Sequence, residues 1–152
     1  PLYKIYKTKE ERKMNMKFEN KDDVKKWLRS IRTLKKDLEL KMDFYKDMLT
    51  CCSLNNIFDD DAYIEQYQTD IKYYKDEIDR LNSTLQTLLS DWERLISLLN
   101  VNETDIITKR YLHGLSWYEV EIKSYICRRQ CFRLQSSALG KLVGQTVSDV
   151  NI

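Results

Sequence analysis

Residues 61–99, DAYIEQYQTDIKYYKDEIDRLNSTLQTLLSDWERLISLL, carry the pattern that decides the fold. Apolar or aromatic side chains recur every seven residues in two rows, which are Ile64, Ile71, Ile78, Leu85, Trp92 and Leu99, and Tyr67, Tyr74, Leu81, Leu88 and Leu95. This spacing predicts one α-helix with a continuous apolar seam, which at 1.5 Å per residue is roughly 58 Å long. Such a helix is stable in water only when its seam is buried against another helix.

The preceding segment, residues 22–49, offers that partner. Its two rows are Val24, Ile31, Leu38 and Tyr45, and Trp27, Leu34, Lys41 and Met48, with Lys41 as the one exception. Asn20 or Asp22 suits the N-cap of this helix. Residues 51–60 include Asn55-Asn56 and lead into Asp59-Asp60-Asp61, which predicts a turn followed by a helix start. We therefore expect an antiparallel helical hairpin, similar to a coiled coil.

Charge is unevenly distributed along the chain. Residues 1–50 hold 15 Lys/Arg and 9 Asp/Glu (net +6), residues 51–99 hold 4 and 10 (net −6), and residues 100–152 hold 7 and 5 (net +2). A basic segment followed by an acidic one favours two helices that lie against each other. Because a hairpin leaves half of each helix uncovered, we expect a homo-oligomer through the hairpin, with a four-helix bundle as one form. A monomeric hairpin folded back on the C-terminal domain is the alternative.

The composition excludes several classes of protein. No apolar run approaches 18 residues, so no membrane partner is expected. The first residues lack the apolar region of a secretory signal, and we interpret the four cysteines (51, 52, 127 and 131) as reduced thiols of a cytoplasmic protein. A zinc site would need Cys127 and Cys131 together with His113 and Cys51 or Cys52, which we disfavour because Cys131 fits a core row. With no catalytic triad and no Gly-rich phosphate loop, the sequence predicts a non-enzyme without cofactors or metal.

Three short helices are predicted after residue 100. Asn102-Glu103-Thr104-Asp105 reads as an N-cap with an acidic first turn, and Gly114 ends that helix. Ser116-Trp117-Tyr118-Glu119 fits a capping box for the second helix. The third begins near Cys127, and its apolar side consists of Cys131, Leu134, Ala138 or Leu139, and Leu142. This layout is typical of a helix-turn-helix that places its last helix in the major groove.

The third helix carries the candidate DNA-binding residues Arg128, Arg129, Gln130 and Arg133, without an acidic residue among them. Arginine can bond O6 and N7 of guanine together, and glutamine can pair with N6 and N7 of adenine. Ser116 and Trp117 are candidates for phosphate contact at a helix start, and Ser137 completes the candidate set. The opposing interpretation is that the arginines merely solubilise an exposed helix face.

These same residues carry a resemblance. Tyr111 to Val120 (YLHGLSWYEV), then Arg128-Arg129, Phe132-Arg133-Leu134 and Ala138-Leu139-Gly140-Lys141-Leu142, resemble sigma-factor region four over about 35 of the 152 residues. With its helical N-terminal part, the chain resembles small phage transcription regulators of the ArpU and RinA type. The resemblance implies that Arg128, Arg129, Gln130 and Arg133 contact bases and backbone. The chain departs from that pattern at Glu121, Ser124 and Tyr125, where the family prefers Ala, Leu, and Gly or Asn respectively.

The predicted organisation has four parts. Residues 1–20 form a disordered or leader-derived tail, with translation starting at Met14 or Met16, and residues 21–100 form the oligomerising hairpin. Residues 101–143 form the helix-turn-helix domain, and residues 144–152 form a flexible tail. The fold class is all-α.

Three functions are compatible with this organisation. The first is a regulator of phage, prophage or mobile-element transcription that binds duplex DNA as a dimer. The second is a small terminase subunit, which would form a ring of many copies. The third is a coiled-coil interaction protein that docks on RNA polymerase and does not bind free DNA.

Overall fold

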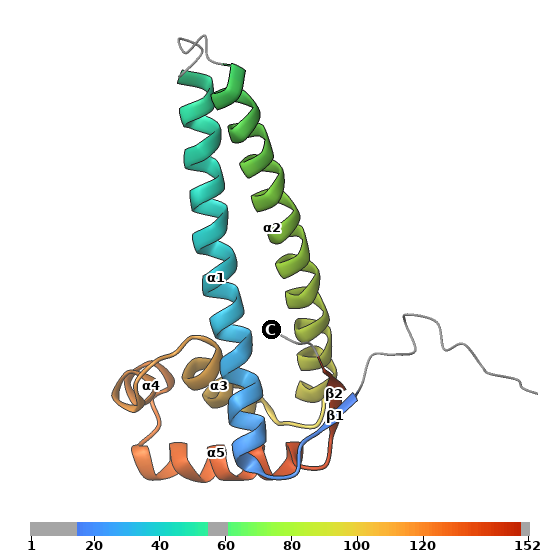
Figure 1. Ribbon diagram of the computed structural model, residues 1–152. Helices are drawn as coiled ribbons and strands as arrows, with labels where there is room; N and C mark the ends of the chain where they lie inside the picture. The colour runs from blue at the N-terminus through green and yellow to red at the C-terminus, as the bar shows by residue number, and fades with distance from the viewer. Residues whose placement is uncertain (1–14, 55–60, 150–152) are drawn as a thin grey trace, which may run out of the picture. The chain divides into compact units, whose positions relative to one another are not determined.

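The computed structural model describes residues 15–54 and 61–149, and this part of the chain is all-α, as the sequence predicts. Its elements are β1 (Asn15–Lys17), α1 (Lys21–Leu54), α2 (Asp61–Ile96), α3 (Val101–Ile107), a π-helical turn η1 (Thr108–Leu112), α4 (Trp117–Ser124), α5 (Arg128–Leu142) and β2 (Thr146–Ser148) (Figure 1). The proposed leader, residues 1–13, and the end of the predicted turn, residues 55–60, lie outside the described residues.

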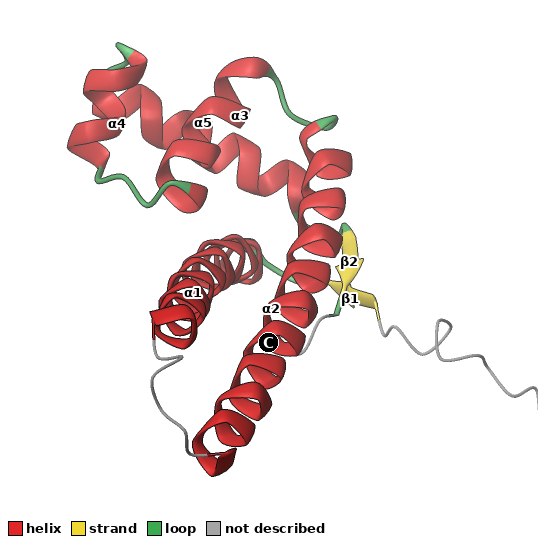
Figure 2. Ribbon diagram, turned by 90° about the horizontal axis from the view of Figure 1, so that it is seen from above, coloured by secondary structure: helices red, strands yellow, loops and turns green. Residues whose placement is uncertain are grey.

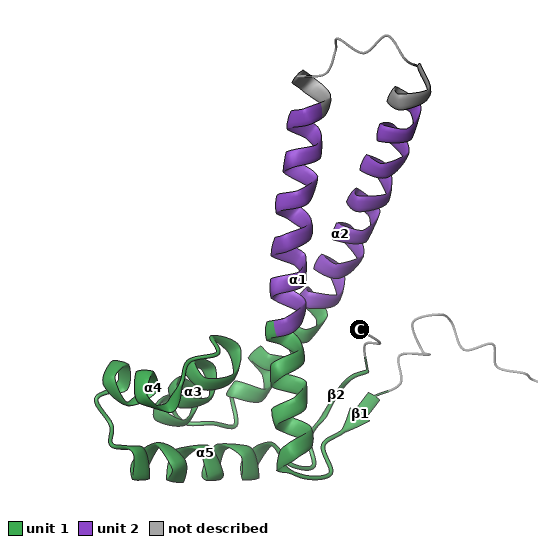
Figure 3. Cartoon of the chain, turned by 60° about the vertical axis from the view of Figure 1, so that its left-hand side comes forward, with its two compact units in different colours: residues 1–32, 87–152 green, residues 33–86 purple. Residues whose placement is uncertain are grey.

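The chain divides into two compact units, residues 1–32 with 87–152 and residues 33–86 (Figure 3). We call them the helix-turn-helix unit and the hairpin unit. Both long helices are shared between the units, because the start of α1 and the end of α2 belong with the short helices. This division differs from the predicted boundary at residue 100, and the difference has a physical cause. The apolar side chains at the start of α1 and the end of α2 pack within the helix-turn-helix unit.

In the hairpin unit, α1 and α2 bury their apolar rows against each other over only part of their length. Leu34, Leu38, Leu81 and Leu85 are buried. Further along, the row residues are only half-buried; these are Tyr45, Met48, Tyr67, Ile71, Tyr74 and Ile78. Phe44 packs on Tyr74 with ring centroids 5.0 Å apart, yet Phe44 remains exposed. The two helices of one chain therefore leave apolar surface uncovered in this unit.

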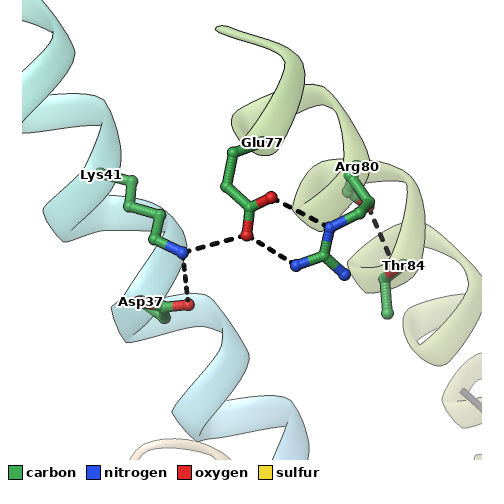
Figure 4. Close-up of polar contacts among 5 residues, drawn as sticks. All are labelled: Asp37, Lys41, Glu77, Arg80 and Thr84. Carbon is green, nitrogen blue, oxygen red and sulfur yellow. Dashed lines mark hydrogen bonds and ion pairs between the residues drawn. The ribbon is translucent and has the colours of Figure 1, made fainter. Parts of the chain in front are cut away.

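Lys41, the exception in the apolar row of α1, has a defined partner. Its Nζ lies 3.2 Å from Glu77 Oε1 on α2 and 3.4 Å from Asp37 Oδ2 one turn earlier (Figure 4). Arg80 donates to the same Glu77 carboxylate through Nε (3.1 Å) and Nη2 (2.6 Å). A cation in the seam is thus matched by a carboxylate on the facing helix.

This cluster predicts a strongly acidic Glu77. The hydrogen bonds from Arg80 and then Lys41 lower the pKa of the Glu77 carboxyl from 4.5 to about 2. A lowered pKa in the folded state means that this group stabilises the fold above about pH 4.5, and its contribution is lost as the pH falls toward 2. In an NMR titration we expect the Glu77 carboxyl resonance to have its midpoint near pH 2 and to move upward in Arg80→Ala. A midpoint near 4.5 in the wild-type chain would contradict the observed geometry.

The helix-turn-helix unit contains a small sheet that the sequence did not predict. β1 and β2 pair antiparallel, with Met16 opposite Val147, and Phe18 donates its N–H to Gln145 O at 3.0 Å (Figure 2). The outer edge of β2 is covered by α2, since Arg94 donates to Thr146 O and Asp91 accepts from Ser148 N at 2.9 Å. The sequence predicted tails without regular structure at residues 1–20 and 144–152. This prediction is wrong for Asn15–Lys17 and Thr146–Ser148, which form the two strands.

Aromatic side chains join this sheet to the two long helices inside the same unit. Phe18, which follows β1, packs edge-on against Trp27 of α1 with centroids 5.6 Å apart. Trp27 in turn lies 6.5 Å from Trp92 of α2. All three rings are buried. Trp27 therefore links the segment after β1 to the end of α2 through two aromatic contacts.

The three short helices form at the predicted places, with one shift at the first. Asn100 rather than Asn102 is the N-cap of α3, because its side chain accepts from Glu103 N (2.8 Å) while Glu103 accepts from Asn100 N (3.0 Å). Asn102 would have placed Asp105, not Glu103, at the third position of the helix. The predicted Ser116–Glu119 capping box and the stop at Gly114, with φ +70°, are confirmed. Ile106, Val120 and Cys131 form the core shared by α3, α4 and α5.

Candidate nucleic-acid interface

The N-terminal half of α5 presents an exposed basic face in the helix-turn-helix unit. Arg128, Arg129, Phe132 and Arg133 are all exposed, and positions i, i+1, i+4 and i+5 lie on the same side of a helix. We call these four residues the arginine patch. No acidic residue occurs anywhere in α5. The residues that α5 buries, Cys131, Ala138, Leu139 and Leu142, face the core of the unit and fix which side of the helix is presented.

The three arginines differ in what holds them. Arg128 Nη2 lies 2.9 Å from Glu121 Oε2, the residue that departs from the sigma-like pattern. Arg133 Nη1 donates to Gln130 Oε1 at 3.1 Å. Arg129 has no hydrogen-bond or ion-pair partner among residues 15–54 and 61–149. Arg129 and Arg133 are therefore the arginines of the patch without a carboxylate partner among the described residues, and they are the more accessible to a ligand. The Gln130 side chain is hydrogen-bonded to Arg133.

Ser116 and Trp117 lie at the start of α4. Ser116 Oγ accepts from Glu119 N at 3.2 Å, so its hydroxyl serves the capping box. Trp117 is half-buried between two partners. Phe132 of α5 packs edge-on against its ring at 5.0 Å, and the Arg110 guanidinium lies 5.0 Å from the ring centroid. These contacts bring Trp117 beside the arginine patch.

Ser137 lies in the other half of α5, which is anchored to the rest of the unit. Ser137 Oγ donates to Glu103 Oε2 at 2.6 Å, and Lys141 Nζ donates to Glu103 Oε1 at 2.6 Å. Lys21 of α1 donates to Ser136 Oγ at 2.8 Å. The structure therefore gives Ser137 a place in an anchor to α3, apart from the arginine patch.

Glu103 is the centre of that anchor and is only 1% exposed. Burial raises the pKa of its carboxyl, but the Asn100 backbone N–H, Lys141 and Ser137 outweigh burial and hold the pKa below its ordinary value. The carboxylate is charged at neutral pH and is fully hydrogen-bonded by these groups. The C-terminal half of α5 is thereby tied to α3, while the arginine patch in the N-terminal half is exposed.

The turn between α4 and α5 contains a strained residue. Tyr125 is the C-cap of α4 with φ 55° and ψ 36°, in the left-handed region, and its side chain is 95% exposed. The left-handed region costs a residue with a Cβ atom about 1 kcal/mol. The departure at this position therefore leaves the turn in the left-handed conformation that Gly or Asn would adopt more easily.

Tyr125→Gly is expected to raise the free energy of unfolding by about 1 kcal/mol, because glycine adopts φ > 0 without strain. The exposed ring leaves no buried contact to lose. Urea denaturation measures the change, and Tyr118→Gly, inside α4, is the control expected to lower stability by about 1 kcal/mol. A destabilised Tyr125→Gly would show that the ring makes a contact that its exposure does not reveal.

The sequence pattern did not point to the roles of three residues, one in the patch and two beside it. Glu121 restrains Arg128, Arg110 stacks on Trp117 and donates to Leu115 O at 2.9 Å, and Phe132 carries an exposed ring. The capping box places Trp117 at the first position of α4, and this was the only sequence signal pointing to the aromatic contact. The pairing with Phe132 depends on how α4 crosses α5, which the sequence pattern does not specify.

The cysteines of this unit do not assemble a metal site. Cys127 is the exposed N-cap of α5, whereas Cys131 is buried and its thiol donates to Ile126 O at 3.7 Å. Burial raises the pKa of the Cys131 thiol, which disfavours the thiolate that zinc requires. Across the described residues, no group of three or more His, Cys, Asp or Glu side chains could hold an ion.

Within residues 15–54 and 61–149, no helix has the length and apolar character needed to cross a bilayer. Comparison of the chain with protein-family models, with curated proteins and with solved structures finds no match.

Proposed function

We propose that this protein is a DNA-binding transcription regulator that reads duplex DNA in the major groove with the N-terminal half of α5. The observation that carries the proposal is the arginine patch: three exposed arginines on one side of a helix that has no acidic residue and is anchored at its other end. The resemblance to phage regulators of the ArpU and RinA type extends the proposal to late-gene control in a phage or prophage, in the cytoplasm of the host.

The chemistry of the patch suits base recognition. A guanidinium presents a planar fork that matches O6 and N7 of guanine, and a second arginine can contact a phosphate. In helix-turn-helix proteins the first turns of the last helix contact base edges. The first two turns of α5 include Arg129 and Arg133, which are exposed. α4 supports α5 through the core of Ile106, Val120 and Cys131.

The hairpin unit supports a second part of the proposal, dimerisation. Its half-buried apolar rows, together with the exposed Leu40, Phe44 and Tyr73, leave apolar surface that a second copy of the hairpin can bury. Two copies would present two α5 helices to one duplex. Binding to two half-sites raises affinity without further contacts in each half.

Fluorescence anisotropy of the full chain with a labelled duplex of mixed sequence tests DNA binding. We expect binding at 50 mM salt that weakens by about 10³-fold or more at 200 mM, if roughly six phosphates are contacted. Light scattering on the same sample is expected to give the mass of a dimer. A ring of eight or more copies would favour a terminase subunit. No binding at any salt, with capture of the chain by RNA polymerase, would favour the interaction protein.

A further inference from the structure

Phe132 is an apolar ring placed among the three arginines of the patch. Its side chain is 45% exposed, although the surrounding exposed residues of α5 are charged or polar. The apolar surface of an exposed ring contributes no stabilising free energy while it faces water. It contributes only when a ligand covers the ring and removes that surface from water. A ligand of the arginine patch that covers this ring must therefore carry an apolar group.

The Phe132 ring packs on an aromatic partner within the helix-turn-helix unit. It forms a T-shaped pair with Trp117, at a centroid distance of 5.0 Å and an interplanar angle of 89°. Trp117 is held in turn by the Arg110 guanidinium, which lies 5.0 Å from its centroid and donates to Leu115 O at 2.9 Å. A ring that already packs on Trp117 loses less rotational freedom on binding than a ring without a partner, which favours its use as a contact.

Duplex DNA offers one apolar group on the edges of its bases. In the major groove this group is the 5-methyl of thymine, the bulkiest apolar feature among the hydrogen-bond donors and acceptors of the base edges. Arginine forks recognise guanine acceptors, whereas a phenylalanine ring, which has no polar atom, suits the apolar methyl group. The combination on α5 thus matches guanine and thymine at neighbouring positions.

We infer that Phe132 contacts the 5-methyl group of a thymine in the DNA site and makes the protein select thymine at that position. This inference rests on the proposed function and adds to it a specificity-determining residue. The arginines would contribute affinity and recognise guanine, and Phe132 would recognise thymine.

Replacement of thymine by deoxyuridine removes the methyl group and leaves base pairing unchanged, so it tests the contact directly. A duplex enriched from a random library by the full chain is remade with each thymine replaced in turn. We expect one position in each half-site at which deoxyuridine weakens binding by about fourfold, the effect of losing one buried methyl group. At that position Phe132→Ala is expected to bind the thymine and deoxyuridine duplexes equally.

Ile122→Ala is the matched control, because it removes an apolar side chain of similar exposure (54%) from α4 outside the arginine patch. It is expected to keep the full fourfold difference. Phe132→Leu retains an apolar contact and guards against loss of folding in Phe132→Ala, and it is expected to keep part of the difference.

Three results would overturn the inference. If deoxyuridine is tolerated at every position by a wild-type chain that binds the duplex, the ring does not read the methyl group and only this inference fails. If Phe132→Ala weakens binding but keeps the fourfold difference, the ring only supports Trp117. If no duplex is bound at all, the inference fails together with the proposed function.

Discussion

Replacing Arg129 and Arg133 together with alanine is expected to lower the affinity for the enriched duplex by at least about 30-fold. Each well-placed arginine contact to a base contributes about 1–3 kcal/mol, and both guanidinium groups are exposed on the same side of α5. The logarithmic salt slope is also expected to fall by about one for each lost phosphate contact. Anisotropy titrations of the double variant and the wild-type chain at several salt concentrations measure both quantities.

Lys35→Ala with Lys36→Ala is the control for charge alone. Both lysines are exposed on α1 in the hairpin unit, so the control removes the same two positive charges from a different part of the chain. Its affinity is expected to stay within about twofold of wild type, because an exposed lysine outside the binding face makes no direct contact with a base or a phosphate. Equal losses in the two double variants would mean that net charge, rather than α5, determines binding.

Glu103→Ala is expected to destabilise the helix-turn-helix unit by about 3 kcal/mol. The substitution removes charge-assisted hydrogen bonds to Ser137 and Lys141, each 2.6 Å long, and the capping bond to the Asn100 N–H. It also leaves a cavity where a buried side chain stood. Urea denaturation followed by tryptophan fluorescence measures the change in the free energy of unfolding.

Glu119→Ala provides a comparison within the same fold, because Glu119 holds the equivalent position in the capping box of α4 but is exposed. It is expected to cost about 1 kcal/mol or less. Equal costs for the two substitutions would show that Glu103 acts only as a cap and does not anchor α5.

The pH dependence of stability is a second test of the hydrogen bonds made by Glu103. The pKa of Glu103 is lowered in the folded state, so its contribution to stability is present above its ordinary value of 4.5 and is lost as the pH falls through the lowered value. Glu103→Gln is therefore expected to lose less stability between pH 5 and pH 3 than the wild-type chain.

The helices could be predicted from the sequence because their patterns are local and repeated. Seven-residue rows located α1 and α2, and the Ser116–Glu119 pair located α4. The small sheet could not be predicted, since Met16 and Val147 form strands only through pairing with a segment about 130 residues away. Three-residue strands carry too few side chains to show an alternating pattern.

The candidate site likewise has features that a local sequence pattern shows and contacts that it does not show. The sequence identified the arginines of α5, because a run of basic residues at the start of a third helix is visible locally. It did not show that Glu121 pairs with Arg128, that Ser137 serves Glu103, or that Phe132 meets Trp117. Each of these contacts depends on how two helices cross.

Enrichment of duplexes from a random library by the full chain tests most directly whether α5 reads DNA sequence. We predict recovery of one motif that contains guanine, present as two half-sites spaced by a multiple of about one helical turn, the arrangement expected for a dimer. The Arg129→Ala, Arg133→Ala variant should not recover it. A wild-type pool that stays as random as the starting library, or an unchanged motif recovered by the variant, would contradict the account.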